Sequence, residues 1–137
     1  MIYEGQISYV TIDNKGNDKN VKESFIFENA ELFGEVESRL YDEYGDLTNF
    51  EVVAIKKSKV KEIVNHRGND DEKVFIAEVA STFLDEETGE EKVTIHKMAL
   101  YAEHYDAAYR KINEYMKQGY TDLELVSLKK TNFIDIL

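Results

Sequence analysis

The sequence predicts an α+β fold built as a tandem duplication of a β-β-α-β unit, with mainly antiparallel sheet or sheets and two helices on one face. Three observations support this. A hairpin pattern occurs twice, an amphipathic helix pattern follows each hairpin, and a strand ending in Lys-Lys-Ser or Lys-Lys-Thr follows each helix. Because the three patterns keep the same order in both halves, we expect an internal repeat.

Each hairpin is predicted from two runs rich in β-branched and aromatic residues that flank a run of turn formers. The second turn is strongly acidic, and Gly89 is expected to adopt the left-handed conformation there. We interpret that acidic run as a charged hairpin tip, because it lacks the ligand spacing of a calcium loop. The expected strands are Tyr3–Ile12 and Val21–Phe27 in the first hairpin, and Val74–Leu84 and Lys92–Tyr101 in the second.

Each helix is predicted from apolar residues that recur at three- and four-residue spacing. Asn29 is the expected N-cap of the first helix, and a neutral His104 is expected to cap the second. The predicted apolar stripes are Phe33, Val36, Leu40 and Tyr44 in the first helix, and Tyr105, Ala108, Ile112, Tyr115 and Met116 in the second.

The last strands, Phe50–Ser58 and Leu123–Phe133, carry the clearest evidence for the repeat, because their lysine pairs align at an offset of 73 residues. The polar segment between the copies has no periodicity and is predicted to be a solvated linker. The expected organisation is a first repeat over 1–64, a linker over 65–73 and a second repeat over 74–137, together forming one compact domain.

Composition narrows the function classes. The chain has no cysteine, which excludes disulfides, thiolate metal sites and a cysteine nucleophile. Its formal net charge of −11 opposes binding to nucleic acid or to an anionic membrane. It shows no signal-peptide pattern and no apolar run long enough to span a bilayer, so a cytoplasmic location is expected.

Sequence motifs give no catalytic or cofactor site. Phosphate-binding glycine loops and the GxSxG motif are absent, so we predict a non-enzyme without cofactors. His66, His96 and His104 lack the spacing of metal ligands, and no metal site is expected.

The duplicated basic clusters are the candidate ligand-binding site. Lysine ammonium groups and hydroxyl donors are what a phosphate group requires. The two lysines of each pair point to opposite faces of a strand, so at most one per copy can line a given surface. The alternative is that these lysines protect sheet edges and neutralise nearby carboxylates. The candidate ligand-binding residues are Lys56, Lys57, Ser58, Lys129, Lys130 and Thr131.

Three segments, MIYEGQISYVTID, ENAELFGEVESRLYDEYGDLTNFEVVAIKKSKVKEI and KQGYTDLELVSLKKTNFIDIL, resemble a small family of unknown function from gut Bacteroidetes and their phages. The resemblance covers most of the chain and implies no particular activity. By looser analogy of size, context and lysine pairs, the chain is similar to phage sponge proteins that sequester nucleotide immune signals.

The leading hypothesis is a non-enzymatic binding protein, a phage anti-defence sponge that sequesters a cyclic nucleotide or another phosphate-bearing small molecule. The alternative is an acidic interaction or structural protein that engages a basic protein partner by nucleic-acid mimicry or within an assembly. In either case we expect a homo-oligomer, because the C-terminal strand is apolar and the chain contains no proline to protect sheet edges.

Overall fold

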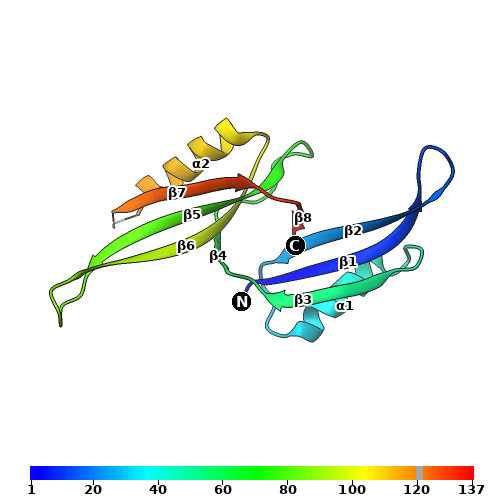
Figure 1. Cartoon of the computed structure of the whole chain (residues 1–137), viewed down its shortest axis with the longest axis horizontal. Helices are drawn as coiled ribbons and strands as arrows, with labels where there is room; N and C mark the ends of the chain where they lie inside the picture. The colour runs from blue at the N-terminus through cyan, green and yellow to red at the C-terminus, as the bar shows by residue number, and fades with distance from the viewer. Residues whose placement is uncertain (120–121) are drawn as a thin grey trace. The chain divides into compact units, whose positions relative to one another are not determined.

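The computed structural model describes residues 1–119 and 122–137 and contains two helices and two four-stranded, mostly antiparallel sheets (Figure 1). The predicted α+β class is therefore confirmed. The elements are β1 (Tyr3–Ile12), β2 (Asp18–Phe27), α1 (Phe33–Tyr44), β3 (Glu51–Lys57), β4 (Val60–Ile63), β5 (Lys73–Leu84), β6 (Glu91–Ala102), α2 (Tyr105–Lys117), β7 (Leu123–Lys130) and β8 (Phe133–Ile136).

The chain forms two compact units. Unit 1 contains Met1–Ser58 and Asn132–Leu137, and unit 2 contains Lys59–Thr131. The strand order is β3-β1-β2-β8 in unit 1 and β4-β6-β5-β7 in unit 2. Counted from its other edge, the order in unit 2 is β7-β5-β6-β4, so β3 corresponds to β7, β1 to β5, β2 to β6 and β8 to β4. Corresponding strands therefore occupy corresponding places in the two sheets, as a duplication would require. The duplication itself stays a prediction, and so does the expected division of the chain into two repeats joined by a linker over 65–73. The bounds of the two compact units differ from those of the expected repeats.

Two short strands were not predicted. The sequence indicated one continuous strand to Phe133, but β7 ends at Lys130 and β8 is a separate strand that pairs in parallel with β2. Similarly, β4 follows β3 and pairs in parallel with β6. Neither of these four-residue strands alternates strictly between apolar and polar residues, so the sequence pattern did not indicate them.

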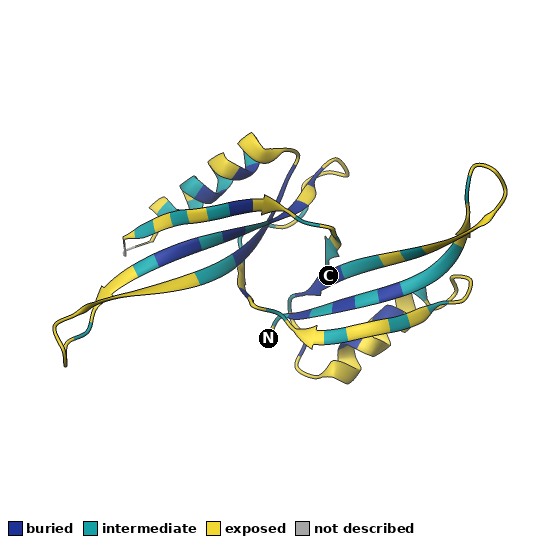
Figure 2. Ribbon diagram, in the orientation of Figure 1, coloured by how far each residue is buried: buried dark blue, intermediate teal, exposed yellow. Residues whose placement is uncertain are grey.

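In unit 1, α1 covers one face of the sheet. Val36 and Leu40 are fully buried and belong to a core that includes Phe25 and Phe27. Figure 2 shows that α1 has both buried and exposed positions. Gly5 allows this close packing, because a Cβ there would lie 3.1 Å from both Leu40 and Phe27. Within unit 1, the described residues place no helix on the opposite face of the sheet, which we call its open face.

In unit 2, α2 packs through Ala108 and Ile112 on one face of its own sheet. The predicted cap is confirmed, since Nδ1 of His104 accepts a hydrogen bond from the Ala107 N–H at 3.2 Å. The prediction for α1 was wrong: Leu32, not Asn29, occupies the N-cap position, and no side chain caps that helix. A turn over 28–32 separates Asn29 from the first helical residue and displaces the cap.

The second hairpin turn has the conformation that its sequence indicates. Gly89 is left-handed, with φ of 72°. Asp85 Oδ1 accepts a hydrogen bond from the Glu87 N–H, and Lys92 lies 2.7 Å from the other carboxylate oxygen. Lys92 and then the Glu87 N–H lower the pKa of Asp85. Among the helices described, none is long and apolar enough to cross a bilayer.

Candidate functional site

A row of four side chains crosses the open face of unit 1, one from each strand. Register pairs Ala54 of β3 with Gln6 of β1, Gln6 with Ser24 of β2, and Ser24 with Phe133 of β8. Paired residues project from the same face of a sheet, so these side chains are neighbours. Gln6 Nε2 donates a hydrogen bond to Ser24 Oγ at 3.4 Å, which orients the amide toward β2.

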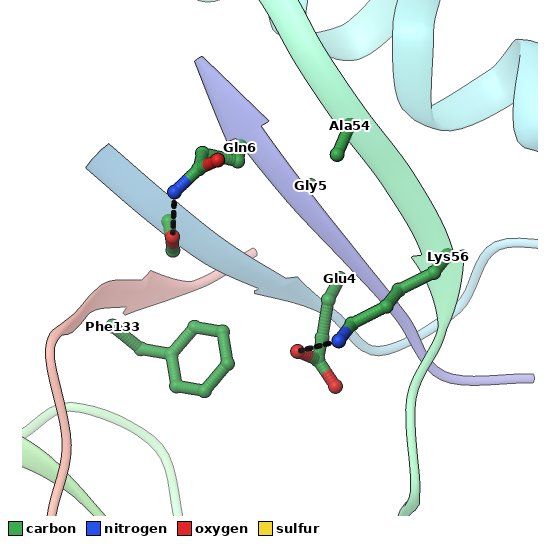
Figure 3. A pocket seen from close by; sticks show the side chains of 7 residues that line it. Glu4, Gly5, Gln6, Ala54, Lys56 and Phe133 are labelled. Atoms are coloured by element: carbon green, nitrogen blue, oxygen red, sulfur yellow. Dashed lines mark hydrogen bonds and ion pairs between the residues drawn. The ribbon is translucent and has the colours of Figure 1, made fainter. Parts of the chain in front are cut away.

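A charged pair borders this row. Register places Glu4 of β1 opposite Lys56 of β3, and the ammonium nitrogen lies 3.9 Å from a carboxylate oxygen of Glu4. The Lys56 side chain is 73% exposed, so this contact holds it weakly and leaves the ammonium available to a ligand. Figure 3 shows the Lys56, Glu4 and Phe133 side chains projecting from the same side of the sheet.

These residues line a cavity of about 200 Å³. Its depth comes in part from the short side chains of Ala54 and Ser24. The longer side chains of Lys56 and Phe133 therefore form walls around a shallow floor. Together they offer an aromatic surface, an amide, a carboxylate and an ammonium group. This combination suits a planar ring bearing hydrogen-bonding groups and a negative charge.

The corresponding row in unit 2 has different chemistry. Register places Ser127, Glu78, Lys97 and Val60 across β7, β5, β6 and β4. An ion pair between Lys97 and Glu78, at 3.7 Å, occupies the centre, and valine stands where unit 1 has phenylalanine. Lys129, the counterpart of Lys56, lies opposite Ile76 instead of a carboxylate. The open-face cavity of unit 1 therefore has no chemical equivalent at this place in unit 2.

Lys130 lines a second cavity, of about 340 Å³, in unit 2. This cavity lies at the start of α2, where Lys73 and His104 also contribute to its wall. The face is the one that α2 covers, because Lys130 pairs with Phe75 of the core. One lysine of each predicted pair thus lines a cavity, but the two lysines come from non-equivalent positions.

The other four predicted ligand-binding residues line neither cavity or form hydrogen bonds within their own unit. Lys57 and Lys129 are exposed and line neither of these two cavities. The Ser58 N–H donates to the Ile2 carbonyl at 2.8 Å. The Thr131 hydroxyl donates to the Val74 carbonyl at 2.8 Å, so its proton is engaged within unit 2. A ligand role for these four residues stays a prediction.

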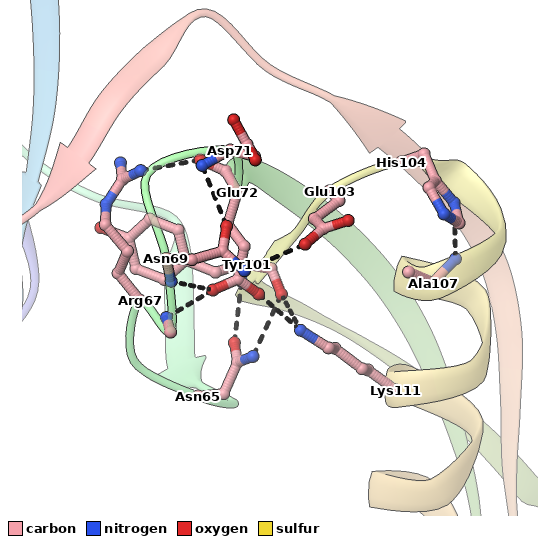
Figure 4. A network of polar contacts seen from close by, with 11 residues as sticks. Asn65, Arg67, Asn69, Asp71, Glu72, Tyr101, Glu103, His104, Ala107 and Lys111 are labelled. Atoms are coloured by element: carbon pink, nitrogen blue, oxygen red, sulfur yellow. Dashed lines mark hydrogen bonds and ion pairs between the residues drawn. The ribbon is translucent and has the colours of Figure 1, made fainter.

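A polar network fixes the segment that the sequence presented as a linker (Figure 4). Glu72 is 6% exposed; one carboxylate oxygen accepts hydrogen bonds from the N–H groups of Gly68 and Asn69, and the other accepts one from Lys111 at 2.7 Å. The Lys111 hydrogen bond, followed by those from the backbone, lowers the pKa of Glu72 below its ordinary value against the opposing effect of burial. The expectation of a solvated segment was wrong for Glu72.

Within residues 1–119 and 122–137, no group of three or more histidine and acidic side chains is arranged to hold a metal ion. Tyr115 of α2 has a raised pKa because of contacts within unit 2. Its hydroxyl donates a hydrogen bond to the carboxylate of Glu62 on β4. Burial and then this hydrogen bond raise the pKa of Tyr115 to about 12.

Residues 1–137, the whole chain, match the family model described as a domain of unknown function (DUF4494). The chain belongs to the DUF4494 family. A search of the curated proteins finds no match. The family description assigns no chemistry. The function of this DUF4494 member must therefore be inferred from the geometry of its cavities.

Of the open-face cavity, sequence reasoning found only Lys56. Glu4, Gln6, Ser24 and Phe133 were missed because they come from three different strands. Alternation does indicate that Glu4 and Gln6 share a face of β1. It does not reveal that β8 pairs with β2, and this pairing brings the aromatic ring to the site.

Proposed function

We propose that this protein is a non-enzymatic binding protein that captures a nucleotide-class ligand on the open face of unit 1. The observation that carries the proposal is the convergence of Phe133, Lys56 and the Gln6 amide on one cavity, in which Glu4 lies between the ring and the ammonium group (Figure 3). An aromatic face stacks on any base, and stacking contributes about 1–3 kcal/mol per base. A lysine supplies the charge that a phosphate requires.

Each side chain has a separate role in this proposal. The ring of Phe133 stacks on the base, and the Gln6 amide hydrogen-bonds its edge, as does the Glu4 carboxylate. Lys56 turns from its weak contact with Glu4 toward the phosphate. The carboxylate also limits the ligand's charge at this point, because it repels a phosphate that approaches the base subsite.

Size sets which part of a ligand enters. A cavity of about 200 Å³ is smaller than the roughly 300–1,000 Å³ typical of sites for drug-sized ligands. We therefore propose that one base and its nearest phosphate occupy it, while the remainder of the ligand extends over the exposed sheet face. Lys73 and Lys130 offer a second, separate anion site at the other cavity.

The finer proposal is that the ligand is a cyclic nucleotide immune signal and that the protein acts as a phage anti-defence sponge. The basic residues at two cavities in an acidic chain, together with the absence of a catalytic motif in the sequence, support it. A sponge must release the ligand unchanged. The expected homo-oligomer belongs to this proposal, and analytical ultracentrifugation at several concentrations tests it.

Isothermal titration with a panel of cyclic and linear nucleotides tests the site. Lys56→Glu should weaken binding by about 10–100-fold, the range expected when a charged hydrogen bond is lost. Lys57→Glu is the matched control, because it makes the same charge change on the opposite face of the same strand. Equal losses in both variants would indicate long-range electrostatics and contradict a local site.

Ala54→Leu tests the cavity without altering charge. Ala54 is exposed, so the larger side chain should leave the fold intact while it fills part of the cavity that Ala54 lines. Circular dichroism checks the fold. We expect binding to be lost in this variant, and unchanged affinity would place the ligand elsewhere.

A further inference from the structure

The outer edge of β6 is uncovered near the second hairpin turn. On its inner side β6 pairs with β5 along its whole length, from Glu91 to Ala102. On its outer side β4 pairs only with Lys97–Ala99. Within the part of the chain that the structure describes, no strand lies beside residues 91–96. Their outward backbone N–H and C=O groups form a template that can accept another strand.

Apolar side chains accompany this edge. Val93 is 63% exposed and Ile95 is 54% exposed, although both are β-branched residues suited to a covered sheet. Val93 pairs with Thr82, and Ile95 pairs with Ala80, on the face opposite α2. Leu84, which is 62% exposed, continues the strip toward the turn. We call these three residues and the adjacent edge of 91–96 the β6 strip.

Unit 1 shows how the same place is protected. The corresponding strand β2 is covered by β8 only over Ser24–Ile26, so its outer edge is likewise uncovered near its turn. There the positions that correspond to Val93 and Ile95 are Asn20 and Lys22, which pair with Val10 and Ser8. Polar and charged residues of this kind prevent an edge from accepting another strand. The apolar composition of the β6 strip is thus specific to unit 2.

The charge beside the strip selects the partner. Asp85, Glu86, Glu87 and Glu90 give the turn over 85–90 a formal charge of −4, whereas Asp13 and Lys15 cancel in the turn over 13–17. A second copy of this chain, with its net charge of −11, would be repelled at long range. A segment with basic residues at one end would be attracted to the turn and oriented by it.

We propose that the β6 strip binds an extended, basic segment of another protein by strand addition. Alternate apolar side chains of the segment cover Val93 and Ile95, its backbone pairs with residues 91–96, and its terminal Lys or Arg residues contact the acidic turn. This surface lies in unit 2 and is independent of the ligand proposed for unit 1. Failure of one proposal therefore leaves the other intact.

A short, blocked peptide tests this proposal, with valine and threonine alternating and a run of lysines at one end. Fluorescence anisotropy measures its binding to the full chain, and amide hydrogen exchange locates it. We expect slower exchange at residues 91–96 and weaker binding as salt is raised. Methylating alternate backbone nitrogens of the peptide should weaken binding by about tenfold or more, because the methylated amides can no longer pair.

The double variant Val93→Asn/Ile95→Lys gives the strip the residues of unit 1 and should likewise reduce affinity by about tenfold or more. Asn20→Val/Lys22→Ile is the reciprocal variant, which gives β2 the apolar residues of the β6 strip. It should bind the peptide only weakly at this new position, because the turn over 13–17 lacks the negative charge of the turn over 85–90. Both pairs of positions are on strand surfaces, and circular dichroism checks that the variants fold. Unchanged affinity in the first variant, or protection outside 91–96, overturns the proposal. Concentration-dependent self-association through 91–96 without peptide binding also overturns it and identifies a second copy as the occupant.

Discussion

Replacing Glu72 by glutamine should destabilise unit 2, although the substitution changes only one atom. In the native protein one carboxylate oxygen accepts two backbone N–H groups and the other accepts Lys111 at 2.7 Å. Glutamine keeps a carbonyl oxygen for the backbone donors but turns its NH₂ group toward the lysine. Two donors then face each other at a position that is 6% exposed in the native chain.

The expected loss is about 2 kcal/mol. Breaking a buried ion pair by removing one partner costs roughly 3–5 kcal/mol. The Lys111 side chain is 37% exposed, so it recovers part of this by hydration, and the retained backbone hydrogen bonds reduce the cost further. Lys111→Met should cost at least as much, because it leaves a carboxylate that is 6% exposed without its counter-ion and also removes the hydrogen bond from Lys111 to the Tyr101 carbonyl.

Urea unfolding monitored by circular dichroism measures these losses, with Asp70→Asn as the control. Asp70 is an exposed carboxylate of the same segment, and its replacement should change stability by less than about 0.5 kcal/mol. Because the folded pKa of Glu72 is lowered, its contribution is fully present above its unfolded pKa and is lost as pH falls through the folded pKa. The difference between wild type and Glu72→Gln should therefore shrink as pH falls below the unfolded pKa. Equal stabilities at pH 7 would refute the reasoning.

Two further predictions concern packing and titration. Gly5→Val should cost about 1–3 kcal/mol in the unfolding free energy, because the new side chain meets Leu40 and Phe27; a neutral result in urea unfolding would show that α1 moves away without cost. The pKa of Tyr115 is about 12, against 10 for the free side chain, so its contribution to stability is present below pH 10 and declines as pH rises toward 12. Ultraviolet titration of Tyr115→Phe should remove this late-titrating tyrosine, and a titration curve identical to that of wild type would contradict the assignment.

Long alternating runs were sufficient to predict the hairpins. Tyr3–Ile12 has the predicted bounds, and β5 begins one residue before the predicted Val74. The helices could be predicted equally well, because the spacing of their apolar residues is regular over three turns. Phe33 and Tyr105, the aromatic residues that begin the helices, were expected in the apolar stripes, but each is half exposed. The Phe33 ring still packs edge-to-face on Tyr3 of the core, with 5.1 Å between the ring centroids.

The candidate site could be predicted only in part from the sequence, because it depends on the order of the strands in the sheet. Lys56 was found from its repeated motif, and the rule that adjacent lysines face opposite ways separates it correctly from Lys57. Phe133 reaches the cavity only because a four-residue strand pairs with β2, and no local pattern encodes that pairing. Burial of Glu72 was missed for the same reason, since its partner Lys111 lies on another element.

Ligand capture tests the central claim most directly. The purified chain is incubated with a panel of cyclic and linear nucleotides, unbound ligand is removed by filtration, and the protein is denatured so that the released ligand can be identified by chromatography. We expect one nucleotide to be recovered intact, to be retained by Lys57→Glu and to be lost from Lys56→Glu. Recovery of nothing would contradict nucleotide binding, and recovery of an altered product would show that the protein is an enzyme.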